Sequence, residues 1–397
     1  MNMKKIGLNI INTSLFLVSP FLAIPSIILG VIKKDKYSIG LFVALVSLLS
    51  YLYIPNDSND KTRYIEIYED FKNWDYGPFI DFYYSHSQDF ILQVIVKYAS
   101  EIGVKIQVVY FLVTAIIMGT ILRIWKNLSQ YLKDDFISIL LIITSISYLD
   151  TFSGTRFMFA ASLTIYAYYL DFFENKKIQP YLWLLIAINI HFSVLVFALA
   201  FIVLKFLTNY PRLLKLFFIG SFIFLLLPKS FLFNIFSMLD LGGGLAVKSD
   251  SYIASDRDFA ENYFKQAGSS GVIIYLAQVM WIFGMYVYML LRLKSKQKYH
   301  LALFFVIGVM NVFYPVTTVF LRYSLLVKIL FAIILILDIK NEKIKKAPVL
   351  FLGLFSLNII TQLIIMRYNI AASYHKDTFM FLDILLQEPI TTNDVIF

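Results

Sequence analysis

The chain has 397 residues, of which 59% are hydrophobic and 15% are charged, and its formal net charge is +9. Apolar runs near 20 residues long recur along the sequence. They predict an all-α, polytopic integral membrane protein and exclude a β-barrel, whose strands alternate over about ten residues. The basic excess lies in short clusters beside apolar runs, so it indicates cytoplasmic loops and gives no reason to expect nucleic-acid binding.

The chain contains no cysteine, which excludes disulfides and thiolate chemistry. Its four histidines, His86, His191, His300 and His375, are scattered and have no partner at metal-ligand spacing. We therefore expect neither a metal site nor a cofactor.

About eleven apolar segments, within a range of ten to twelve, are candidate membrane spans in a single transmembrane domain covering residues 1–397. They are 7–31, 37–54, 105–124, 136–150, 156–173, 180–205, 213–228, 271–293, 300–315, 321–339 and 346–366. Basic clusters mark the cytoplasmic turns, at Lys33/Lys34/Lys36, Arg123/Lys126/Lys133, Lys176/Lys177, Arg292/Lys294/Lys296/Lys298 and Lys340/Lys343/Lys345/Lys346. Three longer segments, 55–104, 240–270 and 367–397, then lie outside.

The run 180–205 conflicts with this topology. If it crosses the membrane once, an odd number of spans separates Lys176/Lys177 from Lys294/Lys296/Lys298, and these two basic clusters cannot both be cytoplasmic. Either this run breaks near His191 into a hairpin of half-helices, or residues 229–241 make a short extra crossing. A break at membrane depth is tolerated only where the backbone is buried in protein or lines a cavity. The first alternative would therefore itself indicate a site.

The first outer segment is rich in acids and tyrosines, among them Asp60 and Tyr64, and it also contains Arg63. Aromatic rings stack on the apolar faces of sugars and carboxylates accept from sugar hydroxyls, so this mixture suits a carbohydrate. The alternative is a solvated loop with an aromatic belt at the membrane interface. Within it, residues 89–102 predict an interfacial helix with an apolar face, and with Lys97 and Glu101 on the opposite face.

The second outer segment begins with Gly242-Gly243-Gly244 and continues to Arg257, a candidate substrate-binding residue. Three glycines free the backbone, so they predict either the hinge of a lid or a plain flexible turn.

Two arginines head predicted spans from the outer side, Arg156 and Arg322. An arginine at membrane depth costs at least ~2.5–3.5 kcal/mol on insertion scales, so each is a functional candidate. Each guanidinium can hold a phosphate through two hydrogen bonds, and two of them suit a diphosphate. The alternative is an arginine that snorkels to the lipid headgroups.

His191 lies in the middle of the run 180–205, with Asn189 and Ser193 placed to fix its tautomer. A lone buried histidine is either a helix-packing residue or, at the depth of two arginines, a proton carrier.

The order of these motifs resembles the EpsG-like branch of the Wzy-type polysaccharide polymerases. The pattern comprises Ser58-Asn59-Asp60-x-x-x-Tyr64, Arg156-x-x-x-Ala160, Asn175-Lys176-Lys177, Ala187-Ile188-Asn189-Ile190-His191-Phe192-Ser193 and Arg322. The chain departs at Phe157, where many members carry a glutamine.

The resemblance implies an enzyme of the bacterial inner (plasma) membrane that joins oligosaccharide repeat units carried on undecaprenyl diphosphate, on the extracytoplasmic face. The product would be an O-antigen, capsule or exopolysaccharide. It also implies a GT-C-like helical fold that needs no metal, with the lipid bilayer and, as further partners, a flippase and a chain-length regulator.

In such a reaction undecaprenyl diphosphate leaves as a sugar hydroxyl attacks, so cations aimed at the leaving group accelerate the step. Arg156 and Arg322 would stabilise that charge, and His191 would be an acid–base or positioning residue. The candidate sugar-binding residues are Asp60, Arg63, Tyr64, Ser193 and Arg257.

Two other classes remain open from the sequence. A flippase for lipid-linked oligosaccharides also needs intramembrane cations, but repeat-built transporters show two related halves, and segment 55–104 has no counterpart in the second half. A membrane acyltransferase that modifies surface polysaccharide also uses a histidine within a span, and it would be favoured if His191 faced the cytoplasm.

Overall fold

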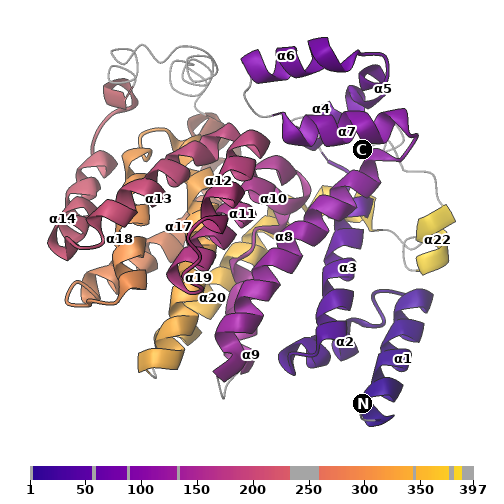
Figure 1. Ribbon diagram of the computed structural model, residues 1–397, viewed down its shortest axis with the longest axis horizontal. Helices are drawn as coiled ribbons and strands as arrows, with labels where there is room; N and C mark the ends of the chain where they lie inside the picture. The colour runs from indigo at the N-terminus through magenta and orange to yellow at the C-terminus, as the bar shows by residue number, and fades with distance from the viewer. Residues whose placement is uncertain are drawn as a thin grey trace.

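The computed structural model describes residues 3–55, 60–86, 90–131, 135–232, 259–342, 346–374 and 380–386, and all regular structure in these ranges is helical (Figure 1). The α-helices are α1 Met3–Val18, α2 Ile24–Ile32, α3 Lys36–Leu52, α4 Asp60–Glu66, α5 Tyr68–Phe71, α6 Tyr76–His86, α7 Ile91–Glu101, α8 Ile106–Leu128, α9 Asp135–Ser145, α10 Tyr148–Phe152, α11 Thr155–Phe172, α12 Gln179–Ile190, α13 Leu195–Leu207, α14 Pro211–Ser221, α17 Phe259–Leu291, α18 Lys298–Val312, α19 Thr317–Glu342, α20 Lys346–Ile365, α21 Arg367–Ser373 and α22 Phe381–Leu386. The described ranges also contain three 3₁₀ turns, η1 Ser129–Tyr131, η2 Phe192–Val194 and η3 Phe222–Leu225.

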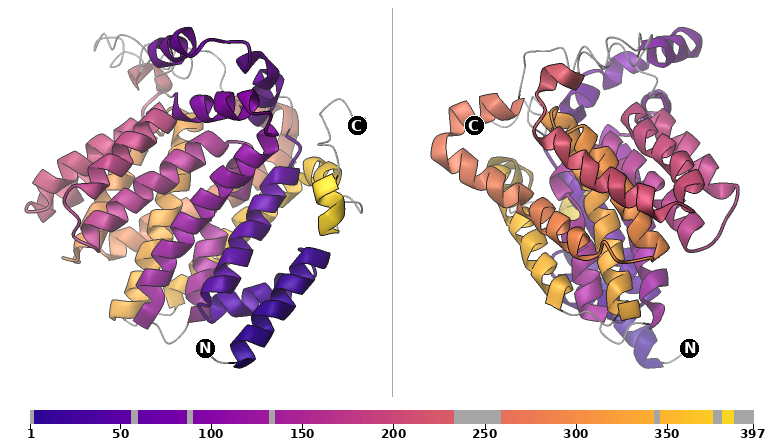
Figure 2. Two further views of the ribbon diagram at one scale, coloured as in Figure 1. Left: turned by 45° about the vertical axis from the view of Figure 1, so that its right-hand side comes forward. Right: turned by 90° about the vertical axis from the view of Figure 1, so that its left-hand side faces the viewer.

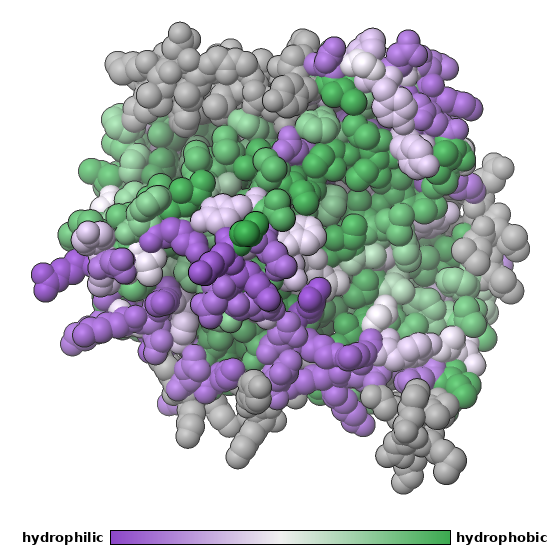
Figure 3. All heavy atoms as spheres, viewed as in Figure 1, coloured by the Kyte–Doolittle hydropathy of each residue, from purple (hydrophilic) through white to green (hydrophobic). Residues whose placement is uncertain are grey.

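Four helices of the described chain are long and apolar enough to cross a membrane: α8, residues 271–291 of α17, residues 317–341 of α19, and α20. Six further apolar helices are 10–17 residues long. Apolar residues form a broad band across the molecule, with hydrophilic residues gathered below it and over the outer segment (Figure 3). The chain is thus an all-helical membrane protein, and the total of eleven spans remains a prediction.

Helix α11 is the centre of the bundle, packed against α8, α12 and α19. Nearly all of its residues are buried. Polar residues are tolerated in it because protein, rather than lipid, surrounds it. This explains why α11 is less apolar than the four long helices.

Two predicted spans are wrong as single helices. The run 7–31 is divided into α1 and α2 by a turn at residues 19–23, where Pro20 ends the first helix and Pro25 occupies the first turn of the second. The run 136–150 ends as α9 at Ser145, and Ser147 then caps the short helix α10 through a hydrogen bond from the backbone N–H of Asp150 to its side chain.

The run 180–205 is a hairpin, as the first of the two alternatives predicts. α12 ends at Ile190, His191 adopts an extended backbone, and α13 begins after the turn η2. Tyr181 near the start of α12 contacts Phe201 in α13, with ring centroids 5.6 Å apart, so the two helices fold back on each other around His191. Helices of twelve and thirteen residues are about 18–20 Å long, short of the ~30 Å hydrocarbon thickness.

Contacts place the basic turns at one end of the bundle. Lys34 donates to the carbonyl of Ser129, which joins the turns after α2 and α8. Asn127 at the end of α8 donates to the hydroxyl of Tyr169 in the last turn of α11. Lys205 of α13 pairs with Asp171 of α11 at the same end.

The outer segment forms helices α4 to α7 across the opposite end of the bundle (Figure 2). As predicted, α7 leaves apolar residues exposed, among them Ile95 and Tyr98. Lys97, which was predicted on the face opposite the apolar one, does not lie at the surface. Its ammonium is fully buried and donates to the carbonyls of Phe71 (3.0 Å) and Trp74 (2.5 Å) and to Glu101 (2.7 Å), which fastens α7 to α5 and the loop beyond it.

Candidate functional site

Arg156 lies against the outer segment. It stands in the first turn of α11, and its guanidinium carbon is 5.8 Å from the ring centroid of Tyr64 in α4. The Tyr64 hydroxyl accepts a hydrogen bond of 3.2 Å from Gln93 of α7. Burial raises the pKa of Tyr83 in α6, and the charge of Arg156 opposes that shift. Arg156 therefore joins the head of α11 to a tyrosine-lined part of the outer segment.

His191 forms the tip of the hairpin and is buried. Its Nδ1 accepts a hydrogen bond of 3.3 Å from the backbone N–H of Ser193, and the Ser193 hydroxyl lies 2.9 Å from the same nitrogen. Since a backbone N–H can only donate, the proton of the neutral ring is on Nε2. The ring packs edge-on against Phe157, with centroids 5.6 Å apart, so the tip reaches the residue after Arg156.

Arg322 lines a pocket of about 420 Å³ between α10, α17, α19 and α20. The polar residues lining it are Asp150, Tyr275, Gln278, Thr317, Thr318, Arg322, Ser324, Lys328, Asn358 and Gln362. The next residue, Tyr323, donates a hydrogen bond of 3.0 Å to the carbonyl of Ser193. The pocket and the hairpin tip therefore share one wall, at the start of α19.

Lys328 lies deeper in the same pocket, six residues and about 9 Å along α19 from Arg322. It is 1% exposed. Among the described residues its ammonium makes one hydrogen bond, of 2.6 Å, to Oδ1 of Asn358, and it lies over the rings of Phe355 (5.1 Å) and Trp281 (5.8 Å). An ammonium has three donors, so this buried cation retains capacity to bind an acceptor in the pocket.

Asp150 is the residue that sequence reasoning missed, and it is the one carboxylate among the described residues lining the pocket. The hydroxyl of Ser147 donates to its side chain, and its charge interacts with both Arg322 and Lys328. A sequence signal was present: Ser147 and Asp150 have the spacing of a helix-capping pair, which marks a helix start inside the run assigned to one span.

The predicted site residues fall into two neighbouring groups. Arg322 lines the pocket, whereas Arg156 lies with Tyr64 and reaches the hairpin of His191 and Ser193 through Phe157. Asp60 begins α4, and Arg63 of the same helix is exposed. Arg257 lies outside the described residues.

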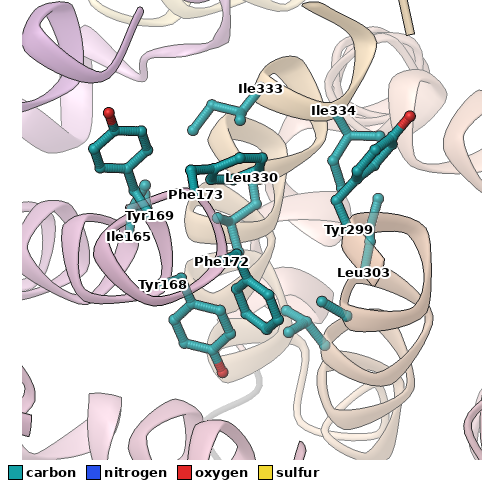
Figure 4. Close-up of a pocket in the computed structure, with 12 residues that line it drawn as sticks. Ile165, Tyr168, Tyr169, Phe172, Phe173, Tyr299, Leu303, Leu330, Ile333 and Ile334 are labelled. Carbon is teal, nitrogen blue, oxygen red and sulfur yellow. The ribbon is translucent and has the colours of Figure 1, made fainter. Parts of the chain in front are cut away.

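A second, smaller cavity lies in the opposite half of the bundle, where side chains of α11, α18 and α19 converge (Figure 4). Its volume is about 40 Å³, and its lining, which includes Phe172, Phe173 and Tyr299, carries no charged group. It offers nothing that would bind a phosphate. A further cavity, of about 460 Å³, is lined by Arg292, Lys294 and Lys296 in the basic turn before α18. The pocket of Arg322 and Lys328 is the candidate site because its cations lie beside a carboxylate and next to the hairpin tip.

Fold and site together define an all-helical membrane protein with cations at the mouth and floor of a polar pocket. A family model, described as the EpsG family, matches residues 39–379. The chain belongs to the EpsG family. No curated protein and no solved structure matches it.

Proposed function

We propose that this protein is a polysaccharide polymerase, a glycosyltransferase that joins oligosaccharide repeat units carried on a polyprenyl diphosphate such as undecaprenyl diphosphate. The growing chain is transferred from its lipid diphosphate to a sugar hydroxyl of an incoming unit, on the extracytoplasmic face. Membership of the EpsG family suggests this class of reaction.

The observation that carries the proposal is the pair of cations in one pocket, Arg322 half-buried at its mouth and Lys328 buried at its floor. The bond to the anomeric carbon breaks with its electron pair passing to the diphosphate, so negative charge grows on the leaving group. Cations fixed beforehand in a site shielded from water stabilise that charge without reorganising. The uncharged polar residues Gln278, Asn358 and Gln362 then suit the remaining phosphate oxygens or the first sugar.

Arg156 and the tyrosines of the outer segment support the sugar side of the same reaction. Tyrosine rings and hydroxyls are of the kind that bind carbohydrate, and Arg156, which lies over the ring of Tyr64, links this tyrosine-rich segment to the hairpin tip. The basic turns at the other end support an outer location for this end. The remaining parts of the proposal are an inner-membrane location, independence of metal, and cooperation with a flippase and a chain-length regulator.

Deleting the gene tests the proposal. Cells without the polymerase are expected to display single repeat units in place of polymer ladders on gels, because export of one unit does not need polymerisation. Long chains of normal length in the deletion strain would contradict the proposal.

Complementing the deletion with Arg322→Lys is expected to leave ladders strongly shortened, since lysine keeps the charge but loses the planar fork that grips phosphate. Arg367→Lys is the matched control, because Arg367 is an exposed arginine after α20, outside the pocket. Equal ladders from the two variants, at equal protein level, would remove Arg322 from the site.

A further inference from the structure

The pocket carries one carboxylate beside its two cations, and this arrangement suits a proton acceptor. Asp150 sits on α10, a helix of five residues between α9 and the head of α11. Its charge interacts with Arg322 and Lys328, which offset part of the cost of burying an anion. Neither cation forms an ion pair with it within 4 Å among the described contacts, so the carboxylate is not closed off by a bidentate partner.

Asp150 also has a structural role, which must be separated from any chemical one. Its backbone N–H donates a hydrogen bond of 3.3 Å to the Ser147 hydroxyl, and that hydroxyl donates a second one to the Asp150 side chain. The first of these bonds caps the first turn of α10, and the second joins the two side chains. At position 150 this structural role needs only a side-chain oxygen that accepts one hydrogen bond, so an asparagine would preserve it. The negative charge of Asp150, which faces the pocket, is not required for it.

We propose that Asp150 is the general base of the transfer reaction, accepting the proton of the sugar hydroxyl that attacks the anomeric carbon. This inference rests on the proposed function. The acceptor oxygen forms a bond to the anomeric carbon, the bond from that carbon to the diphosphate oxygen breaks, and the electron pair leaves with the diphosphate. The hydroxyl proton passes to the Asp150 carboxylate, so atoms and charges balance without a further reactant.

The geometry also assigns a division of work within the pocket. Arg322 and Lys328 face the leaving group along α19, and Asp150 approaches from α10 on another wall. The backbone at Gly154 packs closely behind it, where an added Cβ would lie 3.3 Å from the carbonyl oxygen of Asp150. The carboxylate is therefore held by the Ser147 hydroxyl, on a backbone segment that Gly154 approaches closely, and a general base needs such a fixed placement.

The test uses membrane vesicles from the source cells, right side out, which carry their own lipid-linked repeat units and one complementing variant. Asp150→Asn is expected to lower the rate of elongation by about 10²- to 10⁴-fold at normal protein level, because that is the usual contribution of a positioned base. Ser147→Ala, which weakens the cap and keeps the carboxylate, is expected to lose less than about tenfold. Asp171→Asn, a change of the same kind at the far end of α11, serves as the control.

A binding measurement distinguishes a failure of this inference from a failure of the proposed function. Undecaprenyl diphosphate added as a probe should bind Asp150→Asn as tightly as the wild-type protein, since the cations are intact, and should bind Arg322→Lys less tightly. Elongation by Asp150→Asn within tenfold of wild type would overturn the role of Asp150 and leave the polymerase standing. A wild-type protein that neither elongates nor binds the probe would overturn both.

Discussion

At the scale of single residues, the environments of Arg156 and Arg322 differ more than their common position at the heads of helices suggests. Arg322 faces a pocket with a second cation and a carboxylate, whereas Arg156 contacts the ring of Tyr64. The sequence predicted both as functional and as neighbours of one diphosphate. Of the two, only Arg322 lines the pocket, so we assign the diphosphate to Arg322 and Lys328 and the sugar side to Arg156.

Arg156→Lys tests this assignment. If the planar guanidinium binds substrate through two hydrogen bonds, losing one of them should reduce elongation by roughly 10- to 100-fold, since a charge-assisted hydrogen bond contributes about 1.5–3 kcal/mol. Arg123→Lys is a matched control, because Arg123 lies over the ring of Tyr166 at 5.6 Å, close to the 5.8 Å of Arg156 over Tyr64. Polymer ladders normalised to protein level give the measurement, and equal activity of both variants would indicate that Arg156 only packs.

Lys328→Met separates function from stability. Within the described part of the chain the buried ammonium makes one hydrogen bond. Replacing it with an apolar side chain of similar length should therefore leave thermal stability unchanged or raise it, while elongation falls by about tenfold or more. Lys97→Met should behave oppositely, because three acceptors lose their donor, at a cost of roughly 3 kcal/mol. Its elongation per molecule should stay near wild type. A Lys328→Met protein with lower thermal stability and wild-type elongation per molecule would contradict this.

At the scale of elements, the sequence predicted the long helices that apolar runs encode, and it missed breaks that prolines and local hydrogen bonds make. The long apolar helices α8, α19 and α20 agree with their predicted spans to within a few residues. The break at His191 was predicted only from the parity of the basic clusters, because no proline or glycine marks it. The helix α10 was missed because a capping serine inside an apolar run is a weak signal, and Asp150 was lost with it.

His191 has two roles that substitution can separate. Its Nδ1 caps the turn η2, and asparagine can also accept from the N–H of Ser193, whereas alanine cannot. We expect His191→Asn to keep normal abundance and His191→Ala to lose about 1 kcal/mol of stability. If the ring acts on protons, both should lose elongation, by about 10²- to 10⁴-fold. Wild-type activity per molecule for the asparagine variant would reduce His191 to its capping role.

At the scale of the whole molecule, the contacts between the basic turns at one end also indicate which side of the membrane the tip of the α12–α13 hairpin faces. Lys205 pairs with Asp171 at the basic end, so α13 should return to the cytoplasm and not continue outward. The tip with His191 then points to the outer side, next to the heads of α11 and α19. An acyltransferase that worked from the cytoplasm would need the opposite orientation, so topology distinguishes these functions as well.

Single cysteines test this topology, because the chain has none of its own and each introduced thiol is the sole target of a maleimide. Asp81, Asn209 and Lys296 are exposed positions in the outer segment, after the hairpin and in a basic turn, respectively. A maleimide that cannot cross the plasma membrane should label Asp81→Cys in spheroplasts, and should label Asn209→Cys and Lys296→Cys only after the cells are opened. Asp81→Cys and Lys296→Cys serve as references for Asn209→Cys, since they report the outside and the inside directly. Labelling of Asn209→Cys in closed spheroplasts, with Lys296→Cys still protected, would mean that residues 179–207 cross the membrane once, and the hairpin and the outward-facing His191 would both be wrong.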